Sequence, residues 1–186
     1  IPSSNIIMMP SGCFAEGGDV IVHEPFVFVG VSDDETYEKY TTARTNEAGF
    51  EYLQDEFPGF DFKGFELLKS DVDPRKGSLH LDCAFQPLGE SLLLAPQLFK
   101  HEEDVAWIES QFGKENIFYC TEDEAYDLHT NVFSIGPNEV LISASAVRLK
   151  LWLEERGYTV HAITYDEVVK MGGLLRCSTM PLEREE

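Results

Sequence analysis

Basic side chains are scarce in this sequence, and long apolar runs are missing. Only 14 lysines and arginines stand against 34 aspartates and glutamates, which gives a formal net charge of -20 at pH 7. Such a charge repels nucleic-acid phosphates and anionic membrane surfaces within about a Debye length. Because no run approaches the ~18 apolar residues of a membrane-spanning helix, neither nucleic acid nor a membrane is expected as a partner. The acidic surface either attracts small cations or serves only solubility.

Closely spaced cysteines are absent too. Cys13, Cys83, Cys120 and Cys177 are scattered without a CxxC pair or a short disulfide frame. This spacing indicates neither a zinc site nor a secreted disulfide scaffold, so we expect no metal, no cofactor and a reduced, cytoplasmic setting. The first three of these cysteines are interpreted as inert packing residues.

Three repeated units are visible along the 186 residues, at about 14–78, 79–127 and 128–186. Each reads as two short β-rich runs, an amphipathic helical segment and a further extended run. In the last unit, "AVRLKLWLEERG" predicts a helix with Val147, Leu151 and Trp152 on one stripe. A repeated β-β-α-β unit of about 50 residues is typical of a propeller-like α/β fold, because one unit cannot bury its apolar faces alone.

The second and third units also resemble each other residue by residue. "LHLDCAFQPLGESLLLAP" aligns with "LHTNVFSIGPNEVLISAS", so Leu79-His80 falls over Leu128-His129. If "LHLDCAF" is a strand, His80 and Asp82 project from the same face. An imidazole beside a carboxylate suits proton transfer next to a cationic substrate, although the polar side of an ordinary strand would look the same.

Two further stretches bear candidate functional residues. In "AEGGDV" two glycines precede a strand, which lets the backbone approach another group closely while Glu16 and Asp19 point into one space. Asp19 is a candidate for substrate binding and for support of the turn. In "GGLLRCSTMPL" Cys177 follows a flexible turn, where a thiolate could act as a nucleophile.

Taken in order, "EGGDV", "RTNEAG", "HLD" and "GGLLRCSTMPL" resemble the guanidino-group-modifying (pentein) superfamily. That superfamily includes arginine deiminases, amidinotransferases and dimethylarginine dimethylaminohydrolases. The resemblance covers residues 14 to 184 and implies an α/β propeller of five β-β-α-β modules, of which this chain holds about three. It also implies missing N-terminal modules. A chain that starts at Ile1 is then expected to be a fragment or cleavage product with exposed strand edges that favour self-association.

The resemblance further implies roles for individual residues. Cys177 would attack the guanidinium carbon, His80 would protonate the leaving amine and then activate water or an acceptor amine, and Glu16 would orient His80. Asp82 would pair with the guanidinium, and Arg44 would contact the substrate's carboxylate. The expected function is a cysteine-dependent hydrolase of a small guanidino compound such as arginine or a methylarginine. An amidinotransferase and a non-catalytic binding propeller remain the alternatives.

Overall fold

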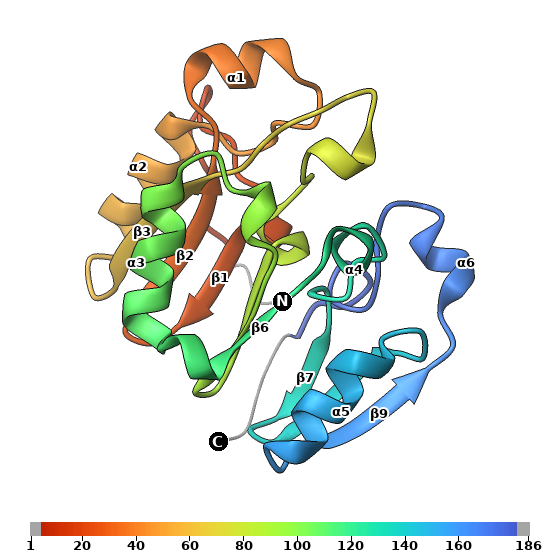
Figure 1. Ribbon diagram of the computed structural model, residues 1–186. Coiled ribbons are helices and arrows are strands. Elements are labelled where there is room, and N and C mark those ends of the chain that lie inside the picture. The colour runs from red at the N-terminus through yellow and green to blue at the C-terminus, as the bar shows by residue number, and fades with distance from the viewer. Residues whose placement is uncertain (1–4, 182–186) are drawn as a thin grey trace.

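The computed structural model describes residues 5–181, so the last residues of the third expected unit lie outside the described part. The described chain forms three sheets of three strands each. In every sheet the first two strands form an antiparallel hairpin, and the third strand runs parallel to the second. Figure 1 shows the first two sheets close together and the third set apart beside them.

The first unit contains β1 (Val20–His23), β2 (Phe26–Val31), α1 (Asp34–Lys39), α2 (Glu47–Glu56) and β3 (Asp61–Glu66). The central strand β2 reads FVFVGV, and its four middle residues are buried. Helix α2 begins after Asn46, whose Oδ1 accepts a hydrogen bond from the Gly49 amide at 2.9 Å. A Cβ on Gly49 would lie 2.1 Å from the Phe14 carbonyl oxygen. The "TNEAG" stretch is therefore both a helix start and a close backbone contact.

The second unit contains β4 (Phe85–Leu88), β5 (Ser91–Leu94), α3 (Glu102–Phe112) and β6 (Ile117–Tyr119). Every residue of β4 and β5 is buried. Continuous burial, in place of alternation, is expected of strands covered on both faces. Five aromatic side chains extend this core into the first unit: Phe28, Phe65, Phe85, Trp107 and Phe112. Phe28 and Phe85 pack with ring centroids 4.9 Å apart, so the first two units share one core.

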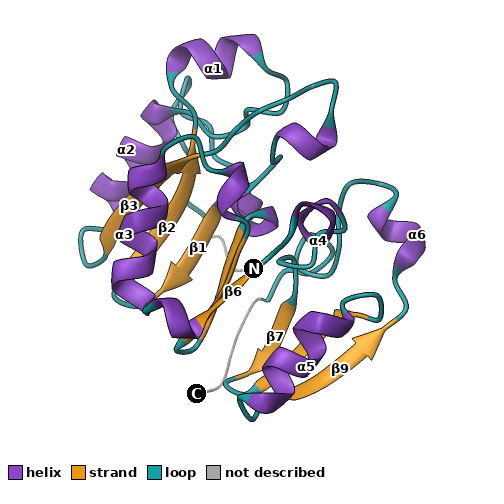
Figure 2. Cartoon of the chain, in the orientation of Figure 1, coloured by secondary structure: helices purple, strands orange, loops and turns teal. Residues whose placement is uncertain are grey.

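The third unit follows helix α4 (Glu122–Tyr126) and contains β7 (Phe133–Gly136), β8 (Glu139–Ser143), α5 (Val147–Glu155), β9 (Thr159–Ile163) and α6 (Asp166–Val169). Figure 2 shows α2 and α3 on the outer side of the first two sheets and α5 packed against the third. Among the described residues, no helix has both the length and the apolar composition needed to span a membrane.

The stripe predicted for α5 is wrong for Val147 and Leu151, whereas its third residue, Trp152, packs partly buried against the core. Val147 and Leu151 are 62% and 57% exposed, whereas Leu149 and Leu153 are fully buried. Both pairs are spaced by four residues, so helical periodicity alone could not tell which of two apolar faces meets the sheet. Leu149 and Leu153 are the pair that belongs to the hydrophobic core.

The strand predicted around His80 is also wrong. Residues Leu81–Cys83 form a turn of 3-10 helix, and β4 starts only at Phe85. The Leu81 amide donates a hydrogen bond to Asp19 Oδ1 at 2.9 Å instead of joining a strand ladder. The backbone therefore bends ahead of β4, and the same-face argument for His80 and Asp82 does not apply.

Candidate active site

Three short segments, each placed before the first strand of a unit, meet at one place. They are the 3-10 turns Gly17–Asp19 and Leu81–Cys83 and the turn at 127–130. The side chain of Asp19 binds the second turn, and Thr130 Oγ1 donates to the Asp82 carbonyl oxygen at 3.3 Å. The repeat thus brings one end of each unit to a common site.

Asp19 is a structural group here. It is 1% exposed, and its two carboxylate oxygens accept hydrogen bonds from Thr45 Oγ1 at 2.7 Å and from the Leu81 amide. Burial raises the pKa of Asp19, and the charge of the half-buried Lys69 opposes that rise. Of its two predicted roles, the contacts favour support of the turn, because both oxygens already have protein partners.

His80 and Glu16 form a close pair. His80 Nε2 lies 2.7 Å from Glu16 Oε2, and the His80 side chain is 14% exposed. Gly18 lies against the imidazole ring, where a Cβ would come within 2.7 Å of Cγ and Nδ1. The second glycine of "EGGDV" is therefore needed because the ring occupies the space that a side chain would take. Glu16 holds the ring from its far nitrogen.

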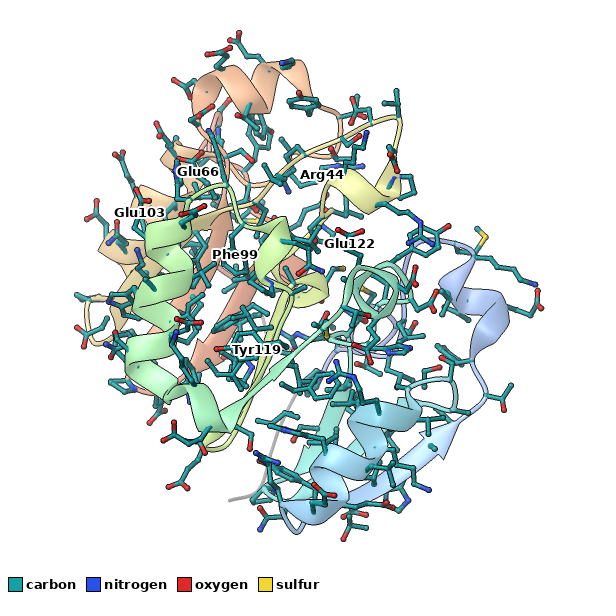
Figure 3. The ribbon with its side chains drawn as sticks, in the orientation of Figure 1. Arg44, Glu66, Phe99, Glu103, Tyr119 and Glu122 are labelled. Carbon is teal, nitrogen blue, oxygen red and sulfur yellow. The ribbon has the colours of Figure 1, made fainter. Side chains whose placement is uncertain are left out.

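Arg44 binds the other oxygen of Glu16. Its Nη1 lies 3.1 Å from Glu16 Oε1, and its Nε donates to the Thr41 carbonyl at 2.7 Å. Desolvation raises the pKa of Glu16, but His80 and Arg44 together outweigh it and hold that pKa below its usual value. Figure 3 shows Arg44 toward the middle of the view, whereas Glu103 projects from α3 at the outer edge. Arg44 thus reaches the site through Glu16.

Asp82 is the buried acid of the site, with 1% exposure. Its carboxylate lies 3.4 Å from Cys83 Sγ and 3.8 Å from Arg176 Nε. Burial, followed by the negative charge of Cys177, raises the pKa of Asp82 to about 6. In contrast to Asp19, this carboxylate faces sulfur and guanidinium groups.

Cys177 lies in an exposed loop directly against Asp82. Its Sγ is 3.8 Å from Asp82 Oδ2, and its amide donates to Asn131 Oδ1 at 3.2 Å. A hydrogen bond with Cys83, then the Leu174 amide, the Asn131 side chain and the charge of His80, outweigh burial and lower the pKa of Cys177 to about 5. These contacts favour the thiolate form of Cys177 over the thiol.

The structure gathers Glu16, Arg44, His80, Asp82 and Cys177 around one site, although they come from distant parts of the sequence. The charge of His80 favours the ionised forms of both Asp82 and Cys177.

Sequence reasoning missed four residues that build the site: Thr45, Lys69, Cys83 and Asn131. Lys69 Nζ donates to the Ser78 and Leu79 carbonyls at 3.0 and 2.8 Å and thereby supports the chain before His80. One signal was available for Asn131, since the repeat alignment puts it at the position of Asp82. Thr45, Lys69 and Cys83 reach the site through tertiary contacts that the local sequence does not reveal.

Asp82, Cys83 and Cys177 also form the one group of potential metal donors found among the described residues, with ligand atoms within 4.8 Å of one another. Two sulfurs and a carboxylate oxygen would suit a soft divalent ion such as zinc. Spacing along the sequence gave no hint of this set, because Cys177 comes from the opposite end of the chain.

The sequence is similar to known proteins. The family model of arginine deiminase matches residues 111–184. The uncharacterised protein YkgA of Bacillus subtilis (strain 168) is 32% identical over 172 residues, which cover 92% of this chain and 53% of that protein.

Two solved structures show the same fold. The N-terminal domain of ArgZ, an arginine dihydrolase of cyanobacteria, superposes with a TM-score of 0.75 at 22% identity, over 92% of this chain and 57% of that one. DDAH from Pseudomonas aeruginosa, in complex with citrulline, superposes with a TM-score of 0.63 at 21% identity. The match covers 88% of this chain and 54% of that one. The chain spans about half the length of these relatives.

The architecture is therefore that of an α/β propeller of the pentein type, and the predicted fold class is confirmed with three repeated sheets in this chain. Its C-terminal part, residues 111–184, is similar to the arginine deiminase family.

Proposed function

We propose that the protein is a cysteine-dependent hydrolase of a small guanidino compound, with Cys177 as its nucleophile. One observation carries the proposal: the sulfur of the exposed Cys177 lies 3.8 Å from a buried carboxylate, beside a glutamate and a histidine that are hydrogen-bonded to each other. This set offers a nucleophile, a proton carrier and two anions for a planar cation. The arginine dihydrolase activity named for ArgZ is consistent with such a substrate.

In the first step, the Cys177 thiolate adds to the electrophilic guanidinium carbon and a C–S bond forms. His80 gives a proton to the leaving nitrogen, the C–N bond breaks, and ammonia or an amine departs. Glu16 accepts the imidazole N–H at 2.7 Å and so stabilises the charged ring. The product of this step is an amidino-thioether on Cys177.

In the second step, His80 removes a proton from water while the water oxygen attacks the same carbon. The C–S bond breaks, the Cys177 thiolate is regenerated, and a ureido compound is released. The low pKa of Cys177, about 5, favours its departure as a thiolate. Cysteine therefore serves both as nucleophile and as leaving group.

Asp82 and Glu16 are proposed to bind the guanidinium of the substrate. Arg176 already places its own guanidinium nitrogen 3.8 Å from Asp82 Oδ2, which supports the fit of this carboxylate to such a group. A planar cation with several N–H donors suits carboxylates better than a point charge does. Arg44 is proposed to contact the substrate's carboxylate after exchanging part of its pairing with Glu16.

The test uses the full-length protein with arginine, methylarginines and agmatine, each with and without glycine or ornithine. We expect a ureido product and one released ammonia or amine per turnover, independent of the acceptor amines. An amidino product that requires glycine or ornithine would instead identify a transferase. Absence of every product, from protein whose Cys177 is shown by alkylation to be free, would refute catalysis and leave a binding propeller.

A further inference from the structure

A second thiol lies beside the proposed nucleophile. Cys83 Sγ, Cys177 Sγ and an oxygen of Asp82 are all within 4.8 Å of one another. Asp82 Oδ1 accepts from Cys83 Sγ at 3.4 Å and also lies 3.9 Å from Cys177 Sγ. All four cysteines of the chain are in the free thiol form. The amidino chemistry proposed above uses Cys177 and forms no bond to Cys83.

The two thiols differ sharply in environment. Cys83 is 4% exposed, whereas Cys177 is exposed to solvent. A hydrogen bond to Cys177, together with burial and the charge of Asp82, raises the pKa of Cys83 well above its usual value. Cys177 has the low pKa already described. Thiolate character and exposure determine which cysteine an oxidant attacks first. An oxidant would therefore react with Cys177, and Cys83 is the neighbouring thiol that could then form a disulfide with it.

We propose that Cys83 and Cys177 form an oxidative modification site, at which a peroxide converts the two thiols into a reversible disulfide. The inference rests on the proposed function only in that Cys177 is taken to be the nucleophile. Its consequence is that oxidation would switch the enzyme off by occupying Cys177, and that reduction would switch it on again.

The chemistry balances with hydrogen peroxide as the oxidant. The Cys177 thiolate attacks one peroxide oxygen, the O–O bond breaks, and a sulfenic acid and hydroxide result. The hydroxide takes a proton from solvent and becomes the first water. Cys83 then gives its proton to Asp82 and attacks the Cys177 sulfur. The S–O bond breaks and hydroxide takes up that proton as a second water. Two thiols have lost two electrons, and one peroxide has become two waters.

The loop that bears Cys177 allows the sulfurs to meet. A disulfide needs an S–S distance of about 2.05 Å, so the pair must close from a separation of up to 4.8 Å. Residues 176–181 are largely exposed, and Gly172 upstream has a φ of +80°. Cys83, in contrast, is fixed in a buried turn. We therefore expect the Cys177 loop to supply the movement.

The experiment treats the full-length protein with hydrogen peroxide, alkylates the remaining thiols and digests with trypsin. Cleavage after lysine and arginine puts Cys83 in peptide 77–100, Cys120 in 115–148 and Cys177 in 177–184. The expected result is a cross-linked pair of peptides 77–100 and 177–184 that dithiothreitol separates. Free thiols on the intact protein should fall from four to two.

Matched variants make the result specific. Cys83→Ser keeps a hydrogen-bond donor beside Cys177 but cannot form the disulfide, so Cys177 should proceed to sulfinic and sulfonic acids that dithiothreitol does not reverse. Cys120→Ser should behave like the wild type. If Cys83→Ser does not fold, the wild-type peptide map alone still decides.

The proposal is overturned if the wild type yields no cross-linked peptide and Cys177 overoxidises irreversibly to the same extent as in Cys83→Ser. These readouts do not require turnover. A disulfide without any activity on guanidino compounds would refute the proposed function alone, and activity without a disulfide would refute this inference alone.

Discussion

Two buried aspartates show how similar positions acquire different roles. Asp19 and Asp82 each lie in a 3-10 turn shortly before the first strand of a unit, and each is 1% exposed. Burial is the first cause of a raised pKa in both. Asp19 is bonded to a hydroxyl and a backbone amide, whereas Asp82 faces two sulfurs and a guanidinium.

The difference lies in which partners remain available. The hydrogen bonds of Asp19 join the first unit to the second and leave it no oxygen for a ligand. The long contacts of Asp82, at 3.4 to 3.9 Å, are of the kind that a tighter-binding cation can replace. Burial and a raised pKa are common to both residues. Only their neighbours distinguish the structural role of Asp19 from the proposed substrate-binding role of Asp82.

The largest effect is expected from removing the charge of Asp82. Asp82→Asn should lower kcat/KM for the guanidino substrate by about 10²–10³-fold, because a charge-assisted contact to the reacting group is lost. Asp19→Asn, which keeps an acceptor for the Leu81 amide, should lose far less activity per folded molecule. Steady-state kinetics of both variants, corrected for the folded fraction, measure these losses. Equal losses of kcat/KM would contradict the different roles proposed for Asp82 and Asp19.

Next in size is the effect of filling the space beside His80. Gly18→Ala should lower kcat by about 10²-fold, since its Cβ would lie 2.7 Å from the imidazole and displace the ring. Gly17→Ala is the matched control, because no atom lies within 4 Å of the Cβ that it adds. Turnover of Gly18→Ala equal to that of Gly17→Ala would show that the position of His80 does not matter.

For the free energy of unfolding, in contrast to activity, the larger loss is expected from substitution of Asp19. Asp19→Ala leaves the buried Thr45 hydroxyl and Leu81 amide without their acceptor, so the free energy of unfolding should fall by about 1–3 kcal/mol. Urea denaturation at pH 7 measures this fall.

For Asp82 the sign follows from its pKa, raised from 3.8 to about 6. The folded protein holds this proton more tightly than the unfolded chain, so the resulting stability is complete below about pH 4 and lost as pH rises through about 6. Asp82→Asn should therefore be more stable than the wild type at pH 8, and its advantage should shrink toward pH 4. An advantage that grew on acidification would contradict the assignment.

The smallest expected effect concerns the reactivity of Cys177. Its alkylation by iodoacetamide should show a midpoint near pH 5, in line with its pKa of about 5. Asp82→Asn should move the midpoint only slightly, because Asp82, with its pKa raised to about 6, is mostly protonated and uncharged at pH 5. Asp19→Asn should leave it in place. Mass spectrometry of peptide 177–184 across a pH series reports the rate.

Local pattern predicted much of the fold. The hairpins follow from pairs of short β-rich runs. The start of α2 follows from the capping side chain of Asn46, and the end of α5 follows from Gly157, whose φ of +84° lies in the left-handed region. The bend at His80 could not be predicted in this way. "HLD" alternates as a strand does, and only the distant carboxylate of Asp19 takes up the Leu81 amide.

Some residues of the site could likewise be predicted from local sequence, and others depend on tertiary contacts. Its charged and nucleophilic residues stand in recognisable motifs, so Glu16, His80, Asp82 and Cys177 could be proposed from the sequence. Cys83 could not, because a single cysteine after an aspartate carries no signal until folding brings Cys177 beside it. Thr45 and Lys69 likewise act through backbone and carboxylate contacts that join separate segments.

The account is tested most directly by trapping the covalent intermediate. The full-length protein is mixed with a guanidino substrate, quenched in acid within the first turnovers and digested, and peptide 177–184 is weighed. We expect an amidino group on Cys177 of the wild type, and none on the Cys177→Ser variant or on any other cysteine. Turnover of the substrate with no adduct on Cys177, or undiminished turnover by Cys177→Ser, would contradict it.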